Sequence, residues 1–167
     1  MDFCFPFDGL EGIGWRDVLS RHAKGLHFAV EAALDRDGFE ALTGFMRGFI
    51  DLVFVHDGRF FLADYKSNYL GPNFSDYGAV ALDTAMHQSA YTLQYLIYSV
   101  ALHRWLRSRI DGYQYDQHFG GVYYLFLRGM HPAHTGSGVF FDRPQGSLIV
   151  DMDALVGLSL IHIWRCR

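Results

Sequence analysis

Two apolar segments on either side of an Asp-Gly pair constrain the fold of this chain more than any other feature. Residues 49–55 and 60–65 are rich in β-branched and aromatic side chains, which favour strands. Asp57 and Gly58 form a dipeptide preferred in two-residue type I′ turns, whose backbone twist matches that of the strands they join. The sequence therefore predicts an antiparallel β-hairpin that reverses at residues 57 and 58.

The register of this hairpin brings two acidic residues together. Counting outward from the turn, Asp51 on the first strand faces Asp64 on the second. The pair falls on a non-hydrogen-bonded position, where Cβ atoms lie roughly 4.5 to 5.5 Å apart. Two carboxylates at that spacing within apolar strands repel each other unless one is protonated or a cation lies between them. We therefore expect a divalent cation at this position.

Lys66 adds a positive charge to the same face, because strand residues two apart point to one side of a sheet. Oxygen ligands with open positions suit Mg²⁺ or Mn²⁺ better than zinc, and such a cation polarises a phosphoryl oxygen and activates a bound water. The lysine would orient that water or neutralise charge in the transition state. Two carboxylates leave the metal shell incomplete, so another protein ligand, a backbone carbonyl or a substrate phosphate must complete it.

The segments before and just after the hairpin carry weaker signals. Before it, the pattern indicates a short strand, a glycine-rich turn and two helix-leaning segments: 3–7, then Gly9, Gly12 and Gly14, then 17–23 and 29–34. After it, residues 67–82 indicate a loop with a helical turn near its end. We expect residues 1–156 to form one domain, truncated at its N-terminus, and residues 157–167 to be a non-native or disordered tail.

One long helix is predicted from residue 84 to residue 109, with Asp83 as its N-cap. Its apolar residues recur at spacings of three and four: Tyr91, Tyr95, Tyr98, Leu102, Trp105 and Leu106. Positive charge in the last turns complements the exposed helix carbonyls, so Arg104, Arg107 and Arg109 indicate a solvated helix end. Two strands follow, at 121–127 and 138–141. The order of elements predicts the α/β class, with a mixed β-sheet flanked by helices.

Composition limits the kinds of partner and compartment. The net charge of -4 argues against a protein that holds nucleic acid by bulk positive charge, so any DNA contact must be local. Cys4 and Cys166 lie far apart without metal-ligand spacing, which excludes a structural zinc motif and fits a reducing cytoplasm. The sequence contains neither a long apolar run nor a signal peptide, so we expect a soluble protein without a membrane partner. The aromatic share of 17% predicts a surface that faces another domain or subunit.

Three motifs, in order, resemble those of the PD-(D/E)XK nucleases, in the form found in RecB-type helicase-nucleases. They are Gly48–Phe54 (GFIDLVF), Asp64–Asn68 (DYKSN) and Gln94–Tyr98 (QYLIY). The similarity continues through residues 101–104 and 119–128 and covers roughly residues 44 to 155. The resemblance implies a restriction-endonuclease-like core and the activity of a metal-dependent deoxyribonuclease.

The same resemblance implies roles for individual residues. Asp51, Asp64 and the backbone carbonyl of Tyr65 would bind Mg²⁺, for which Mn²⁺ or Ca²⁺ substitutes in binding, and Lys66 would be the catalytic lysine. Gln94 and Tyr98 match a Q-x-x-x-Y motif that faces the site and the DNA backbone. The implied substrate is a DNA single strand fed from a helicase motor, in double-strand break processing and recombination. The implied partners are the other subunits of a RecBCD-like complex and a strand-exchange protein.

The chain departs from the family pattern in one respect. The RecB-type site also draws a metal-binding histidine from a helix upstream of these motifs, and His22 and His27 match no such motif. We therefore predict no histidine ligand. Two alternatives stay open: a catalytically incomplete docking module with the same fold, and another PD-(D/E)XK exonuclease. A Cas4-like protein is disfavoured because the chain lacks a cysteine cluster for an iron-sulfur centre.

Overall fold

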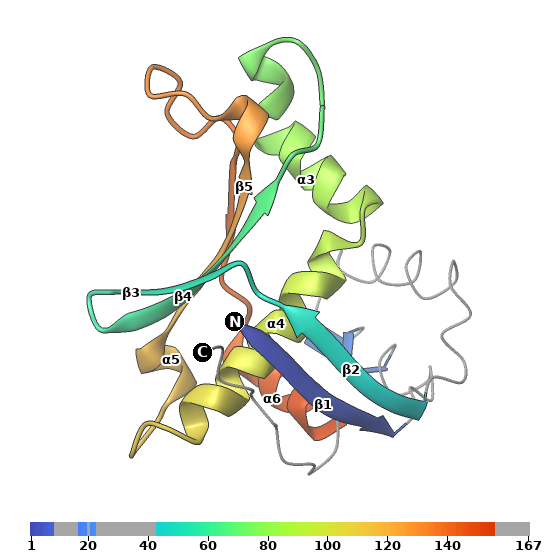
Figure 1. Ribbon diagram of the computed structural model, residues 1–167, viewed down its shortest axis with the longest axis vertical. Helices are drawn as coiled ribbons and strands as arrows, with labels where there is room; N and C mark the ends of the chain where they lie inside the picture. Colours follow the sequence, from blue (N-terminus) through green and yellow to red (C-terminus); the bar gives the residue numbers. More distant parts are fainter. Residues whose placement is uncertain (9–16, 20, 23–42, 156–167) are drawn as a thin grey trace.

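The computed structural model describes residues 1–8, 17–19, 21–22 and 43–155, and within them two β-sheets (Figure 1). The smaller sheet pairs β1 (Asp2–Asp8) with β2 (Thr43–Phe49) in antiparallel fashion. The larger sheet has four strands, β3 (Leu52–His56), β4 (Arg59–Lys66), β5 (Phe119–Phe126) and β6 (Val139–Asp142). Within it β4 and β5 are parallel, whereas β3–β4 and β5–β6 are antiparallel.

Helices cover the larger sheet and confirm the predicted α/β class with a mixed, helix-flanked sheet. They are η2 (Phe74–Tyr77), α3 (Ala79–Gln88), α4 (Tyr91–Arg107), α5 (Tyr115–His118), η3 (Leu127–Gly129) and α6 (Gly146–Leu155). The helix α4 runs beside the sheet and packs against both β5 and α6 (Figure 1). None of the helices in the described part of the chain combines the length and apolar character needed to cross a lipid bilayer.

The hairpin between β3 and β4 has the predicted register. His56 pairs with Arg59, and the pairing continues to Leu52 opposite Ala63. Asp57 and Gly58 have φ angles of 47° and 73°, both in the left-handed region that a type I′ turn requires. The turn prediction is therefore confirmed, and it fixes which face of β4 each side chain occupies.

The ladder ends one pair before the two carboxylates, so the prediction that Asp51 and Asp64 form a cross-strand pair is wrong. The amide of Tyr65 donates instead to Oδ2 of Asp51 at 2.9 Å. The backbone of Ile50 is held by Met1, with its amide 2.8 Å from the Met1 carbonyl oxygen and its own carbonyl accepting from the Met1 amino group. The backbone of Ile50 is therefore bonded to Met1, and the side chain of Asp51 accepts the bond from the Tyr65 amide where the ladder has ended.

The predicted long helix is two helices. α3 ends at Gln88 and α4 begins at Tyr91, because Ala90 adopts a left-handed conformation with φ of 55°. No proline or glycine marks this break in the sequence. Asp83 lies inside α3 and is not its cap, since Gly78 precedes the first residue of that helix. The predicted loop at 67–82 is helical from residue 74 onward, with a break at Gly78.

The apolar stripe predicted for this region is confirmed in α4. Tyr95, Leu102 and Leu106 are buried in the core, whereas three further members of the stripe are partly buried and pack against that core, namely Tyr91, Tyr98 and Trp105. The core continues into the sheet through side chains such as Leu62 of β4 and Val122 of β5. The stripe thus packs α4 against the core.

The expected solvated helix end is wrong for Arg104, which is 7% exposed. Its guanidinium forms an ion pair with the carboxylate of Asp153 on α6, and its Nη2 donates to the Asp153 carbonyl oxygen at 2.8 Å. Arg107 joins the same carboxylate at 3.0 Å, and the guanidinium of Arg109 lies 5.7 Å from the ring centre of Trp105. Arg104 and Arg107 therefore link α4 to α6 through Asp153. Helix periodicity does not predict this contact, because it joins segments that are distant in the sequence.

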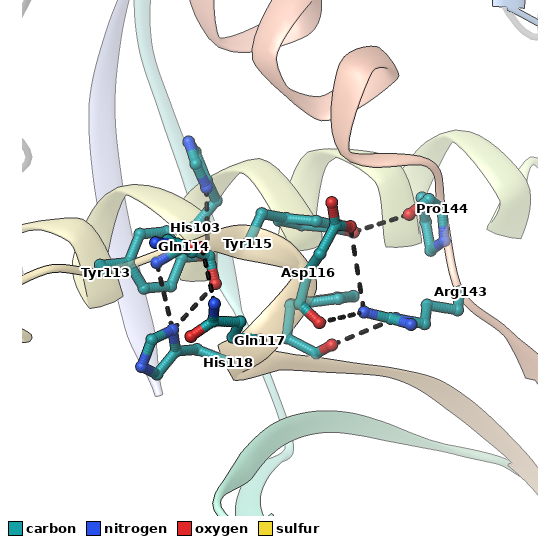
Figure 2. Close-up of polar contacts among 10 residues, drawn as sticks. His103, Tyr113, Gln114, Tyr115, Asp116, Gln117, His118, Arg143 and Pro144 are labelled. Carbon is teal, nitrogen blue, oxygen red and sulfur yellow. Dashed lines mark hydrogen bonds and ion pairs between the residues drawn. The ribbon is translucent and has the colours of Figure 1, made fainter.

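A polar cluster around α5 joins the segment after β6 to the start of β5 (Figure 2). The hydroxyl of Tyr115 donates to the carbonyl of Pro144 at 2.9 Å. Arg143 donates from Nε to the carbonyl of Phe119 at 3.2 Å and from Nη2 to the carbonyl of Asp116 at 2.8 Å. The two Arg143 bonds satisfy backbone carbonyls at the entry to β5 and link that entry to the segment after β6.

The expectations for the first 45 residues are tested in part. The short strand is confirmed as part of β1, and residues 17–19 and 21–22 are helical within the helix-leaning segment 17–23. The glycine-rich turn, the segment 29–34 and the tail 157–167 lie outside the described residues.

The strands expected at 121–127 and 138–141 correspond to β5 and β6.

The left-handed turn makes a testable prediction about Gly58. A Cβ at this position meets no atom within 4 Å, so Gly58→Ala introduces backbone strain alone. We expect it to lower the free energy of unfolding by about 1 to 2 kcal/mol, measured by urea denaturation. Gly58→Asn is the matched control, because asparagine tolerates this conformation and should cost clearly less. Equal losses for the two variants would contradict a type I′ turn.

Candidate active site

The strand β4 carries an ion pair in its last residues. Asp64 is 6% exposed and its Oδ2 lies 2.5 Å from Nζ of Lys66, whose side chain is 11% exposed. The two residues are two apart on one strand and share a face, as the sequence predicted. Since both charges are largely removed from water, each depends on the other and on further polar contacts for stabilisation.

Asp51 reaches this strand from the bend between β2 and β3. It is exposed, and its Oδ2 accepts the bond from the backbone amide of Tyr65, the residue between Asp64 and Lys66. The structure therefore brings the carboxylates of Asp51 and Asp64 to the same end of β4 by a route other than the ladder pairing expected from the register.

The helix α4 contributes Gln94 and Tyr98, one helical turn apart. Nζ of Lys66 donates to Oε1 of Gln94 at 3.0 Å, and Nε2 of Gln94 lies 3.0 Å from the Tyr98 hydroxyl, to which it donates. These contacts link both residues of the Q-x-x-x-Y motif to Lys66. The side chains that the sequence singled out on three separate segments are thus in one cluster.

Two tyrosines of this cluster were missed by sequence reasoning. Tyr124 lies opposite Asp64 in the parallel β4–β5 register, and its hydroxyl donates to Oε1 of Gln94 at 2.9 Å. The Lys66 ammonium lies 4.0 Å from the ring centre of Tyr91 and 4.9 Å from that of Tyr124, in cation–π contact with both. The periodicity of the helix identified Tyr91 only as part of an apolar stripe. No local pattern identifies Tyr124, because the pairing of β4 with β5 joins segments that lie far apart in the sequence.

Burial and charge together set the protonation chemistry of the cluster. Burial raises the pKa of Asp64 above its ordinary value of 3.8, the hydrogen bond and charge of Lys66 lower it, and the charge of Asp51 raises it. Burial and the charges of Asp64 and Asp51 raise the pKa of Tyr98, against the hydrogen bond from Gln94. Burial also raises the pKa of Tyr124, so that its hydroxyl stays protonated and donates.

The donor chemistry of the cluster fits a hard divalent cation but supplies few ligands. Two carboxylates at one end of β4, with the backbone carbonyl of Tyr65 between Asp64 and Lys66 in the chain, offer oxygen atoms alone, as Mg²⁺ prefers. Within the described residues, no group of three or more His, Cys, Asp or Glu side chains lies close enough together to hold a metal ion. A cation here would therefore need water or substrate oxygens to complete its shell.

His22 is placed elsewhere, where its Nε2 lies 2.7 Å from Oδ2 of Asp151 on α6. The expectation for His27 falls outside the described residues.

An open pocket of about 240 Å³ lies against the cluster. Gln94 and Tyr98 form part of its wall. The other lining residues are Ala90 just before α4, two residues of α4 and two of the smaller sheet, namely Leu93, Ile97, Phe3 and Gly48. The ring of Phe3 contacts that of Tyr98 edge to face, with centres 5.5 Å apart. The pocket gives a ligand access to the two motif residues from the side of the smaller sheet.

Comparison with known proteins gives a consistent picture. The chain is 50% identical over 123 residues to the protein "RecBCD enzyme subunit RecB" of Escherichia coli strain K12, covering 73% of this chain and 10% of that protein. It is 52% identical over 117 residues to the protein of the same name from Haemophilus influenzae, covering 70% of this chain and 10% of that protein. The Mycobacterium tuberculosis counterpart is 43% identical over 126 residues, which cover 71% of this chain and 12% of that protein.

The resemblance drawn from the motifs is therefore confirmed at the level of sequence relatives. The chain spans about a tenth of the length of these relatives. No family model matches the chain. The restriction-endonuclease-like core stays a prediction, since the structure establishes a mixed sheet flanked by helices and no finer fold assignment.

The electrostatics of the cluster predict opposite shifts for two variants. Because the pKa of Asp64 is raised on folding, the stability associated with its protonated form is present below pH 3.8 and is lost as the pH rises through the raised pKa. Lys66→Met should raise that pKa further, and Asp51→Asn should lower it. Carbon-13 NMR of labelled aspartate carboxyl groups in metal-free protein measures the pKa of Asp64 in each variant. Shifts of the same sign would contradict this charge arrangement.

Proposed function

This chain is a homologue of a segment of RecB subunits, and on that premise we propose that it is a Mg²⁺-dependent DNA nuclease region. It would hydrolyse DNA phosphodiester bonds during double-strand break processing and recombination. The observation that carries the proposal is the convergence of Asp51, Asp64, Lys66, Gln94 and Tyr98 from separate segments into one cluster.

In this proposal Asp51, Asp64 and the Tyr65 carbonyl hold the cation, with Mn²⁺ or Ca²⁺ able to replace Mg²⁺ in binding. The bound cation would polarise a phosphoryl oxygen and acidify a bound water. Asp64 would bring a carboxylate in a buried environment, where opposite charges attract each other more strongly than in water. Asp51 is exposed and anchored through Tyr65, so it offers a second carboxylate in a fixed position.

Lys66 supplies the positive charge that stabilises the negative charge developing on the phosphoryl oxygens. Its ammonium is held against Asp64 and Gln94 and above the ring of Tyr91. An ammonium held in place by these contacts needs little reorganisation during the reaction, which is the main source of electrostatic catalysis. Gln94 and Tyr98 would face the DNA backbone from the wall of the open pocket.

The substrate in this proposal is a single DNA strand delivered by a helicase motor. The net charge of -4 fits such delivery, because the motor, and not this chain, would bind DNA through a large positive charge. The proposed partners are the other subunits of a RecBCD-like complex, in agreement with the name of the relatives. The proposed compartment is the bacterial cytoplasm, where the DNA lies.

Asp64→Ala should abolish Mg²⁺-dependent cleavage of linear DNA, with a loss of about a thousandfold or more. Product formation on gels measures the loss, and unwinding by the full-length helicase-nuclease should be unaffected. Asp57→Asn is the control, since it removes an exposed carboxylate in the hairpin turn and should leave cleavage unchanged. Retained cutting by the Asp64 variant would refute the assignment.

Calorimetric titration with Mn²⁺ separates the nuclease from a docking module of the same fold. A nuclease site should bind Mn²⁺, and Asp51→Asn should weaken that binding at least about tenfold, because a hard cation loses one of two charged ligands. A docking surface for partner subunits or a strand-exchange protein needs no cation. Absence of Mn²⁺ binding by the parent chain would favour the docking module over the nuclease.

A further inference from the structure

The Lys66 ammonium is held by more partners than an ion pair requires. One contact is the carboxylate of Asp64 at 2.5 Å, another is Oε1 of Gln94 at 3.0 Å, and the rings of Tyr91 and Tyr124 cover it at 4.0 and 4.9 Å. Under the proposed function the Asp64 carboxylate also binds a cation. The ammonium then competes with that cation for Asp64, and its position depends on the remaining contacts.

The amide of Gln94 is the next strongest of those contacts, and it can point in either of two directions. Oε1 must face Lys66 for the amide to accept a hydrogen bond from the ammonium, because the NH₂ group only donates. Because the ammonium only donates, Lys66 itself sets this orientation. In that orientation the Tyr124 hydroxyl donates to Oε1 at 2.9 Å and the Tyr98 hydroxyl accepts from Nε2 at 3.0 Å, so both tyrosines hold the amide in place. Tyr98 is only partly buried, whereas Tyr124 is fully buried.

Tyr124 is well placed to hold the Gln94 amide, because the core immobilises its side chain. Its backbone lies in β5 opposite Asp64, and its ring packs against the rings of Tyr91 and Tyr95 at 5.7 and 6.2 Å. Burial raises the pKa of its hydroxyl, so that this group remains a donor. The hydroxyl donates a hydrogen bond to Oε1 of Gln94, and the same oxygen accepts a hydrogen bond from Lys66.

We infer that Tyr124 is a positioning residue that holds the Lys66 ammonium in the site through the amide of Gln94 when the Asp64 carboxylate is engaged by a cation. The inference rests on the proposed function for the role of the cation. The hydrogen-bonded chain from Tyr124 through Gln94 to Lys66 is present without it.

The reactivity of the Lys66 amine tests this role without any need for DNA cleavage. The sequence contains two lysines, Lys24 and Lys66, so modification by acetic anhydride followed by peptide mass spectrometry reports Lys66 separately, with Lys24 as internal reference. The measurement is made on metal-free protein in the Asp64→Ala background, which removes the carboxylate that a cation would occupy. Tyr124→Phe is added to that background, and Gln94→Met serves as a second, stronger variant.

Tyr115→Phe is the matched control in the same background. Like Tyr124, Tyr115 is a buried tyrosine whose hydroxyl makes one hydrogen bond, in this case to the carbonyl of Pro144 (Figure 2). We expect Tyr124→Phe to speed Lys66 modification about fivefold, the change that corresponds to one lost hydrogen bond. Gln94→Met should speed Lys66 modification at least as much, and Tyr115→Phe should leave the modification rate unchanged. Equal rates for the two tyrosine variants would overturn the inference.

A second measurement keeps this inference separate from the proposed function. In the chain with Asp64 intact, Tyr124→Phe should leave Mn²⁺ affinity within about twofold, since the hydroxyl that it removes donates to Gln94. The same variant should lower the kcat of DNA cleavage about tenfold with little change in KM. A parent chain that neither binds Mn²⁺ nor cleaves DNA would defeat the proposed function. The modification rates would still decide whether Tyr124 positions Lys66.

Discussion

The position of β4 between two different neighbours determines most of this structure. A two-residue turn joins it to β3 on one side, and β5 pairs with it in parallel on the other. Parallel pairing requires a crossover connection, which here consists mainly of α3 and α4. Because Asp64 and Lys66 lie on β4 and Gln94 lies on the crossover, the connection that builds the sheet also assembles the polar cluster.

The hairpin could be predicted from the sequence because its causes are local. Two adjacent residues in the left-handed conformation set the turn, and alternation then decides which side chains share a face, including Asp64 and Lys66. The prediction fails at Asp51, where the cause is distant. Met1 holds Ile50 by backbone hydrogen bonds and ends the ladder, and the carboxylate of Asp51 bonds to the amide that the ladder leaves unpaired.

The other departures from the sequence prediction also come from contacts between distant segments. A left-handed alanine divides the expected long helix without a glycine or proline, so propensity alone gives no warning. Arg104 is buried because Asp153 of α6 receives it, although charge at a helix end ordinarily predicts exposure. Tyr124 enters the cluster through the parallel register of β5, which depends on the path of the whole crossover. The charged residues of the cluster were therefore identifiable from the sequence, as were Gln94 and Tyr98 from their motif, whereas Tyr124 was not.

The neutral partners matter because a buried ion pair is costly when it stands alone. Removing Asp64 and Lys66 from water costs several kcal/mol for each ion, and their mutual attraction offsets this only with good geometry and further hydrogen bonds. Gln94 and the faces of Tyr91 and Tyr124 provide such additional stabilisation on the side of the lysine. A lysine stabilised in this way does not depend on Asp64 alone. Under the proposed function, the carboxylate would be shared with a cation while the ammonium keeps its place, which a simple two-residue pair would not allow.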